Sequence, residues 1–174
     1  MKYDITIYTP AKTNKEFRFL LGNPGKKPLF VIGLNPSTAD DKIPDHTLRK
    51  VMGYSDRNGF DSFVMMNLYA QRTPYPEELH DQVNDQLHAE NVFHILSTLK
   101  EHNDISILAA WGETISERTF LKSCLADVFK KTQNKNITWL KIGNLTKTGH
   151  PRHPSRGAYQ DLTKFDIQEY LCDV

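Results

Sequence analysis

The side chains of this sequence that could do chemistry gather in four short polar segments, and each segment directly follows an apolar run. They supply amides, which both donate and accept hydrogen bonds, imidazoles, which change charge near neutral pH, and guanidinium groups, which pair with phosphates. In an open sheet of parallel strands, ligands bind in the crevice beyond the carboxyl ends of the strands, so these segments are expected to converge on one site. The candidates are Gly33, Asn35, Pro36, Ser37 and Asp40 after the first run, Asn67, Tyr69 and Arg72 after the second, Trp111 after the third, and His150, Arg152, His153, Ser155 and Arg156 after the fourth.

The first apolar run, residues 29–34, carries no polar alternation, which is typical of a strand buried on both faces of a sheet. Gly33 permits close backbone approach and Pro36 ends the ladder of hydrogen bonds, so the chain is expected to leave the sheet here. Two short alternating runs, residues 4–9 and 17–20, flank a turn-prone segment and predict an antiparallel pair at one edge of the sheet. Further buried strands are expected at residues 63–69, 105–110 and 137–142.

Helical periodicity fills the segments between these strands, with Asp45 as the expected cap of one helix and residues 83–100 as the clearest helical pattern. The alternation of strands and helices predicts an α/β fold, namely a three-layer αβα arrangement with a mainly parallel four-stranded core sheet plus the N-terminal antiparallel β pair. Residues 1–174 are expected to form a single domain. The residues expected to face the core are Leu48, Val51 and Met52 in the first helix, Ala89, Val92, Phe93, Leu96 and Leu99 in the second, Leu121, Cys124, Leu125 and Val128 in the third, and Leu162, Phe165 and Leu171 in a terminal helix.

The composition is that of an ordinary globular protein of 174 residues, 39% of them hydrophobic and 25% charged. The formal net charge of +1 excludes a globally basic nucleic-acid binder, so a basic surface must be local. The sequence has neither the apolar core of a signal peptide nor a run of roughly 18 apolar residues, so no membrane partner is expected. These features favour a cytoplasmic protein.

Metal and cofactor chemistry is not expected from this sequence. Cys124 and Cys172 are too few for a four-thiolate zinc or iron–sulfur site. Two cysteines can form a single disulfide, but buried free thiols in a reducing cytoplasm are the favoured alternative. The histidines outside the polar segments have no Cys or His partner at a metal-binding spacing; they are His80, His88, His94 and His102.

Four motifs occur in order along the chain: Gly-Leu-Asn-Pro-Ser-Thr-Ala-Asp from Gly33, Asn-Leu-Tyr-Ala from Asn67, Ala-Ala-Trp-Gly from Ala109 and Gly-His-Pro-Arg-His-Pro from Gly149. Together they resemble an uncharacterised bacterial and phage family that is known only as a numbered domain of unknown function. More remotely, the pattern is similar to the uracil-DNA glycosylase superfamily, whose members carry a Gly-x-Asp/Asn-Pro loop, a later Asn, a small-residue strand ending in Gly, and a His-Pro-Ser loop. This resemblance implies a glycosylase-like fold and an enzyme that recognises a nucleobase and hydrolyses an N-glycosidic bond in DNA or a nucleotide derivative.

The resemblance also implies roles for individual residues. Breaking an N-glycosidic bond leaves negative charge on the departing base, and His153, at the position of the motif histidine, would stabilise that charge by donating to a base oxygen. His150 is the alternative in the same loop. Asn67 would read a base edge, because an amide offers both a donor and an acceptor. Tyr69 or Phe60 would stack on the base, as pockets for flipped bases require.

At the position of the attacking water the resemblance places Asn35, which cannot act as a general base unless Asp40 or Asp45 helps. The catalytic candidates are therefore Asn35, His153 and Asp40. The usual proline after His-Pro-Ser is replaced by Arg156-Gly157, so a wedge into the minor groove is expected to be missing or altered.

Several candidates have an alternative that needs no ligand. Ser37 can cap a helix, Tyr69 and Trp111 can be core residues, and Arg72 can be solvated. Residues 141–160 contain no acidic residue, and their cations can track a phosphate backbone, bind the phosphates of one nucleotide, or be solvated. These cations are Lys141, Lys147, Arg152 and Arg156.

Three functions remain open from the sequence. The leading hypothesis is the nucleobase-recognising hydrolase, whose partner is a nucleic acid or a nucleotide-like small molecule. The second is a non-catalytic nucleotide- or nucleic-acid-binding module with the same pocket, which the amide of Asn35 and the nearly neutral net charge favour. The third is a phosphoryl- or glycosyl-transfer enzyme with a small-molecule substrate, and the absence of a Gly-x-x-x-x-Gly-Lys-Ser/Thr loop argues against an ordinary nucleotide hydrolase.

Overall fold

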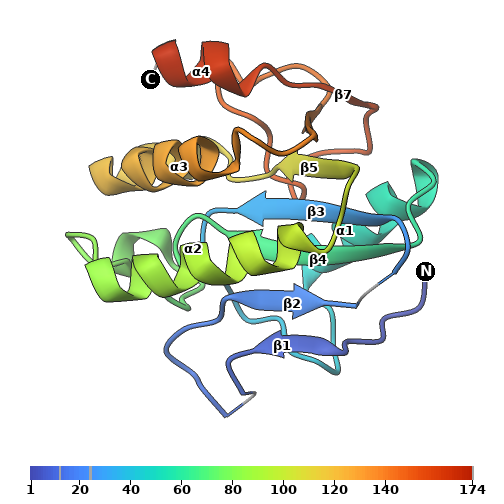
Figure 1. The fold of residues 1–174 in the computed structure, drawn as a ribbon, viewed down its shortest axis with the longest axis horizontal. Coiled ribbons are helices and arrows are strands. Elements are labelled where there is room, and N and C mark those ends of the chain that lie inside the picture. Colours follow the sequence, from blue (N-terminus) through green and yellow to red (C-terminus); the bar gives the residue numbers. More distant parts are fainter. Residues whose placement is uncertain (12, 24, 174) are drawn as a thin grey trace.

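The structure, a computed structural model, describes residues 1–11, 13–23 and 25–173 of the chain. Its strands are β1 (Ile7–Thr9), β2 (Leu20–Gly22), β3 (Pro28–Gly33), β4 (Ser62–Asn67), β5 (Ile105–Ala109), β6 (Ile137–Ile142) and β7 (Leu162–Lys164). Within the described residues these strands form one seven-stranded sheet in the order β1-β2-β4-β3-β5-β6-β7 (Figure 1). β3 pairs in parallel with β4 and β5, and β5 pairs in parallel with β6, whereas the pairs β1–β2, β2–β4 and β6–β7 are antiparallel.

The strands β3, β4 and β5 end together at one edge of the sheet. Gly33 of β3 lies beside Asn67 of β4, and Ile32 lies beside Ala109 of β5. Every residue of β3 and β4 is buried, as expected of strands that are covered on both faces. The segments that leave these strands therefore begin as close neighbours, although they are far apart in the sequence.

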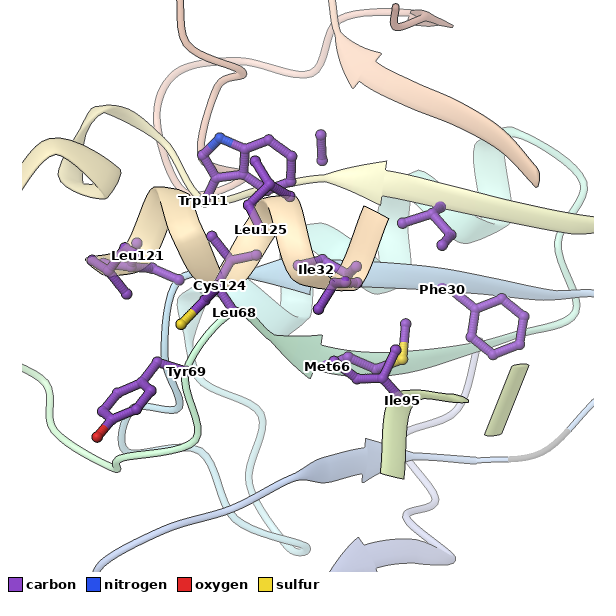
Figure 2. Close-up of a cluster of buried hydrophobic side chains, with 14 of the residues drawn as sticks. Phe30, Ile32, Met66, Leu68, Tyr69, Ile95, Trp111, Leu121, Cys124 and Leu125 are labelled. Carbon is purple, nitrogen blue, oxygen red and sulfur yellow. The ribbon is translucent and has the colours of Figure 1, made fainter. Parts of the chain in front are cut away.

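Helices cover both faces of the sheet. α1 (His46–Arg57) packs on one face, and α2 (Asp85–Lys100), α3 (Thr119–Thr132) and α4 (Ile167–Asp173) share the core on the other face. Figure 1 shows α2 and α3 in front of the sheet and α1 behind it, and Figure 2 shows part of the core on the α2 and α3 side. Short 3-10 helices, η1 (Pro76–Glu78) and η2 (Glu113–Glu117), lie in the loops after β4 and β5. The chain is therefore an α/β protein with a mixed sheet.

The first helix begins where its cap residue predicts. The Asp45 carboxylate accepts a hydrogen bond from the backbone N–H of Leu48 at 2.9 Å, and Asn58 is the C-cap. Leu48 and Val51 are buried as expected, and in α3 the whole predicted stripe is buried; it consists of Leu121, Cys124, Leu125 and Val128. Among the described residues, none of the helices has the length and apolar character that crossing a membrane requires.

The core face predicted for α2 is confirmed at Val92 and Leu99, which are buried, and at the partly buried Leu96, but it is wrong at two residues. Phe93, which was expected in the core, has 64% of its surface exposed, and Ala89 is also exposed. Asn91 is fully buried instead, and its amide nitrogen donates to the carbonyls of Asn67 (2.8 Å) and Leu68 (3.2 Å) where β4 ends. The Asn91 side of the helix therefore faces inward together with Val92, Ile95 and Leu99, and the Asn91 amide nitrogen is satisfied while its Oδ1 has no partner among the described residues.

The predicted terminal helix is also wrong at its start. Leu162 belongs to β7, which pairs antiparallel with β6, and the backbone N–H of Phe165 then donates to the Trp139 carbonyl at 2.9 Å. This pairing satisfies backbone groups of β6 that would otherwise lie at an open edge, so the helix begins only at Ile167.

At the opposite edge, β2 runs from Leu20 to Gly22 and not over residues 17–20 as predicted. Gly22 is the last residue of this strand. A Cβ at this position would clash with the Phe63 carbonyl oxygen, so glycine is required for β2 to approach β4 this closely.

Candidate functional site

A cavity of about 830 Å³ lies at the edge where β3, β4 and β5 end, and we refer to it as the edge cavity. Its wall contains residues 33–37 after β3, Asn67 at the end of β4 and residues 112–114 after β5. The loop after β6, the start of α1, the loop after β4 and Arg18 also contribute to the wall. Cavities that hold small molecules commonly have volumes of roughly 300–1,000 Å³, so the edge cavity has room for a nucleotide-sized ligand.

Most of the predicted site residues line this cavity. They come from three segments, namely the end of β3 with its following loop, the end of β4 and the loop after β6, and they are Gly33, Asn35, Pro36, Ser37, Asn67, Arg152, His153, Ser155 and Arg156. The remaining candidates, Asp40, Tyr69, Arg72, Trp111 and His150, do not line it, and their contacts are described below.

The imidazole of His153 is half-buried in the cavity wall and is held by Ser155. Its Nδ1 accepts from the Ser155 hydroxyl at 2.7 Å and from the Ser155 backbone N–H at 3.3 Å. A neutral ring whose Nδ1 accepts carries its proton on Nε2. Burial, reinforced by the positive charge of Arg156, lowers the pKa of His153 to about 4. At pH 7 this histidine is therefore neutral and has an Nε2–H donor to offer.

Gly112, which directly follows Trp111 beyond β5, allows the His153 loop to pack close to the end of that strand. It has a positive φ of 69°, a conformation that glycine adopts without strain, and a Cβ there would lie 3.1 Å from the Cβ of His153. A side chain at this position would press on the histidine and shift it.

The two asparagines of the site each use their amide nitrogen on backbone carbonyls. Asn35 Nδ2 donates to the carbonyls of Thr73 (2.8 Å) and Pro36 (3.1 Å), which ties the loop after β3 to the loop after β4. The Asn67 amide is satisfied when its Nδ2 faces the carbonyls of Asn35 (3.3 Å) and Met66 (3.2 Å). In both residues the amide oxygen is then the atom that can meet a ligand or a water molecule.

Two predicted site residues hold the loop after β3 from outside the cavity. Arg72 donates from Nε to the Ser37 carbonyl (3.0 Å) and from Nη2 to the Ala39 carbonyl (3.1 Å). The Asp40 carboxylate accepts from the backbone N–H groups of Lys42 and Ile43, both at 2.8 Å, and these bonds lower the pKa of Asp40. The substrate-binding role predicted for Arg72 and the catalytic role predicted for Asp40 therefore find no support in their geometry, because both side chains are engaged by the backbone.

Tyr69 is a core residue and does not stack on anything in the cavity. It is fully buried, its hydroxyl lies 2.6 Å from Nδ1 of His80, and the same hydroxyl accepts from the Asn84 backbone N–H at 3.1 Å. Its ring packs edge-on against Phe120 (Figure 2 shows the surrounding core). Tyr69 thus fixes the loop before α2. Phe60, the other residue predicted to stack on a base, does not line the cavity either, and the Lys27 ammonium lies 5.5 Å from the centre of its ring.

Trp111 and His150 share a partner at the C-terminal end of the chain. The fully buried Trp111 indole donates from Nε1 to the Tyr170 hydroxyl at 3.3 Å. His150 is buried, with Nδ1 2.8 Å from the same hydroxyl and Nε2 3.2 Å from the Ser116 hydroxyl. Both nitrogens of His150 are therefore occupied inside the protein, and His153 is the histidine of this loop that faces the cavity.

The model of a protein family described as "Protein of unknown function (DUF1643)" matches residues 18–155. The chain belongs to this family. The match confirms the resemblance to the uncharacterised domain family that the motifs predicted. No curated protein and no solved structure matches the chain.

Sequence reasoning missed several polar residues of the cavity, among them Glu113 and Arg18, the residue at which the match to the DUF1643 family begins. The Arg18 side chain lines the edge cavity, and only 4% of the residue is exposed. The sequence pattern that could have identified Arg18 is its position as the one charged residue in the otherwise apolar run from Phe17 to Leu21. An arginine in such a run must meet polar partners or a ligand when the run is buried.

Two carboxylates also line the cavity, and neither is Asp40. Asp45 uses one oxygen to cap α1, and Glu113 accepts from the Thr148 hydroxyl at 2.8 Å. Hydrogen bonds from Thr148 and Thr146 lower the pKa of Glu113, so this group is ionised at neutral pH. Among the described residues, no group of three or more His, Cys, Asp or Glu side chains could hold a metal ion.

Proposed function

We propose that the edge cavity binds a nucleobase and that the protein hydrolyses the N-glycosidic bond between this base and its sugar. The observation that carries the proposal is the meeting of Asn35, Asn67 and His153, from three separate segments, in one cavity wall. We further propose that the parallel strands β4, β3, β5 and β6 form a glycosylase-like core, on which these loops take the order that the motif resemblance implies.

In the proposed reaction the bond between the sugar C1′ and the base nitrogen breaks, and its electron pair leaves with the base. His153 donates its Nε2–H to the base oxygen that becomes negative, and a neutral donor placed there stabilises the charge without itself transferring a proton. Asn67 Oδ1 accepts from an N–H of the base edge. The lowered pKa of His153 is compatible with this role, because the ring stays neutral at pH 7.

A water molecule then adds to C1′ and must lose a proton. Asn35 can orient this water through Oδ1 but cannot accept the proton. Asp45 lines the same cavity, and one of its oxygens caps α1. We therefore assign the proton acceptor to Asp45 in place of Asp40.

A non-catalytic binding module is the second candidate, and one observation favours it. Asn35 stands where a carboxylate would activate water, and its amide nitrogen is committed to the Thr73 and Pro36 carbonyls. A cavity with this residue can hold a nucleotide without cleaving it.

The decisive experiment is a search for released base. The wild-type protein is incubated with nucleoside 5′-monophosphates and with oligonucleotides that carry uracil, mismatched bases or modified bases, and free base is separated by chromatography. We expect release by the wild-type protein and a higher rate for Asn35→Asp, which supplies the missing carboxylate. If neither protein releases any base while the wild type still binds a nucleotide, the enzyme proposal fails and the binding module takes its place.

A further inference from the structure

Arg18 is a buried cation at the edge of the sheet where the proposed base site lies. Its backbone N–H donates to the Ala70 carbonyl at 3.0 Å, which places it beside the segment that leaves β4. The residue before it, Phe17, forms a bridge with Gln71. Arg18 therefore enters the cavity from the antiparallel side of the sheet, whereas most of the other cavity residues lie on loops that follow parallel strands.

The guanidinium of Arg18 is incompletely neutralised by the protein. Nη1 donates to the Ala39 carbonyl, and the group lies 5.7 Å from the centre of the Tyr8 ring. In the part of the chain that the structure describes, no carboxylate forms an ion pair with it. Burial and the nearby charge of Arg72 lower the pKa of Arg18, whereas Tyr8 and the carboxylate of Asp45 oppose this shift without forming an ion pair with the guanidinium. A guanidinium has several N–H donors, and a buried one that lacks a direct ion pair is costly, so its remaining donors favour an anion in the cavity.

The charge of the cavity wall agrees with an anionic ligand. Four cationic side chains but only two carboxylates line it, while His153 is neutral. The chain as a whole has a formal net charge of only +1, so the positive charge is concentrated here. The cations are Arg18, Lys147, Arg152 and Arg156, and the carboxylates are Asp45 and Glu113.

Arg18 differs from the other cations in its burial. Arg156 is exposed, and Arg152 donates from Nε to the Asn144 carbonyl of its own loop at 2.9 Å. Cations at the surface can meet the backbone of a long strand, but an arginine of which only 4% is exposed can be reached only by a group that enters the cavity. A terminal phosphate can enter, whereas a phosphodiester inside a strand would have to bring nucleotides in on both of its sides.

We infer that Arg18 binds the phosphate monoester of a free nucleotide inside the edge cavity, so that the substrate is a mononucleotide and not an internal position of DNA. This inference rests on the proposed function for the recognition of the base. It adds that the phosphate, and not only the base, is recognised.

The test compares ligands that differ only in the phosphate. Binding of nucleoside 5′-monophosphates and of the matching nucleosides is measured by titration calorimetry for the wild type, Arg18→Gln, Arg18→Lys and the control Arg49→Gln, which changes an exposed arginine of α1. Hydrogen bonds to charged groups contribute about 1.5–3 kcal/mol, so we expect Arg18→Gln to weaken monophosphate binding about 10- to 100-fold. Nucleoside binding should not change, Arg18→Lys should retain part of the affinity, and Arg49→Gln should match the wild type.

The two proposals fail in different ways. If the wild type binds nucleosides as tightly as monophosphates, or if Arg18→Gln weakens both equally, the role of Arg18 is wrong although base recognition stands. If an oligonucleotide with the base at an internal position binds as tightly as the monophosphate and loses as much affinity in Arg18→Gln, the mononucleotide assignment is wrong. If no nucleoside, nucleotide or oligonucleotide binds, the proposed function and this inference fail together.

Discussion

The loop after β3 and the loop after β6 both line the edge cavity, but their polar side chains are used differently. In the first loop the backbone carbonyls of Ser37 and Ala39 accept from Arg72, and the amide of Asn35 donates to neighbouring carbonyls. In the second loop His153 is held through one nitrogen only. The polar groups of the loop after β3 are therefore used to fix that loop, whereas the loop after β6 keeps an imidazole donor available for a ligand.

The two histidines of the second loop repeat this contrast within three residues of sequence. His150 uses both ring nitrogens, on Tyr170 and Ser116, whereas His153 uses Nδ1 on Ser155. A motif residue whose polar atoms are all satisfied inside the protein positions its neighbours. One with a remaining donor is the candidate for chemistry.

The largest effect is expected from replacing the two histidines in turn. His153→Ala should lower the rate of base release about 10²–10³-fold, the typical result of removing one donor to a developing anion. His150→Ala should chiefly lower stability, because the buried Tyr170 hydroxyl loses a partner. Single-turnover rates and denaturant unfolding of both variants check this. Equal losses of rate at equal stability would remove the distinction between the two residues.

The pH dependence of stability provides a second test of His153. Its pKa in the folded protein is about 4, below the ordinary value of 6.5, so the unfolded chain binds the proton first as the pH falls. The free energy of unfolding should therefore fall as the pH drops from about 6.5 to about 4. His153 should account for at most about 3 kcal/mol of this loss. The comparison with His153→Gln isolates the contribution, because other histidines titrate in both proteins. Parallel stability curves would mean that the ring is not desolvated.

Arg72→Gln tests whether the loop after β3 is held from outside the cavity. The variant loses bonds to the Ser37 and Ala39 carbonyls, so its free energy of unfolding should fall by about 2 kcal/mol. Arg49→Gln, an exposed control, should stay within about 0.5 kcal/mol of the wild type. A variant of unchanged stability that no longer binds nucleotide would instead make Arg72 a ligand-binding residue.

The smallest effect is expected from Gly112→Ala, and Gly157→Ala is its matched control. Both glycines have a positive φ, 69° and 83°, so each substitution should lower stability by about 1 kcal/mol. A Cβ at Gly112 meets His153, whereas a Cβ at Gly157 meets nothing within 4 Å. Only Gly112→Ala should therefore also slow base release. Equal rates for both variants would show that the histidine tolerates the displacement.

The sequence by itself determined the features that depend on neighbouring residues. The apolar run at residues 29–34, the cap at Asp45 and the buried stripe of α3 are local patterns, and each appears in the structure near its predicted position. The rule that loops gather beyond the ends of parallel strands also predicted that Asn35, Asn67 and His153 meet, and all three line one cavity.

Only the tertiary structure decided which polar residues are free to meet a ligand. The buried Asn91 of α2 bonds to the end of β4, and Tyr170, from the last helix, bonds to His150. The apolar residues around Arg18 indicate that it needs polar partners, but its place in the cavity is set by its backbone bond to Ala70 and by the bridge between Phe17 and Gln71. The physical reason is that a hydrogen-bond partner or a counter-ion comes from a distant segment, and its position is set by the packing of the whole sheet and not by the spacing of residues along the chain.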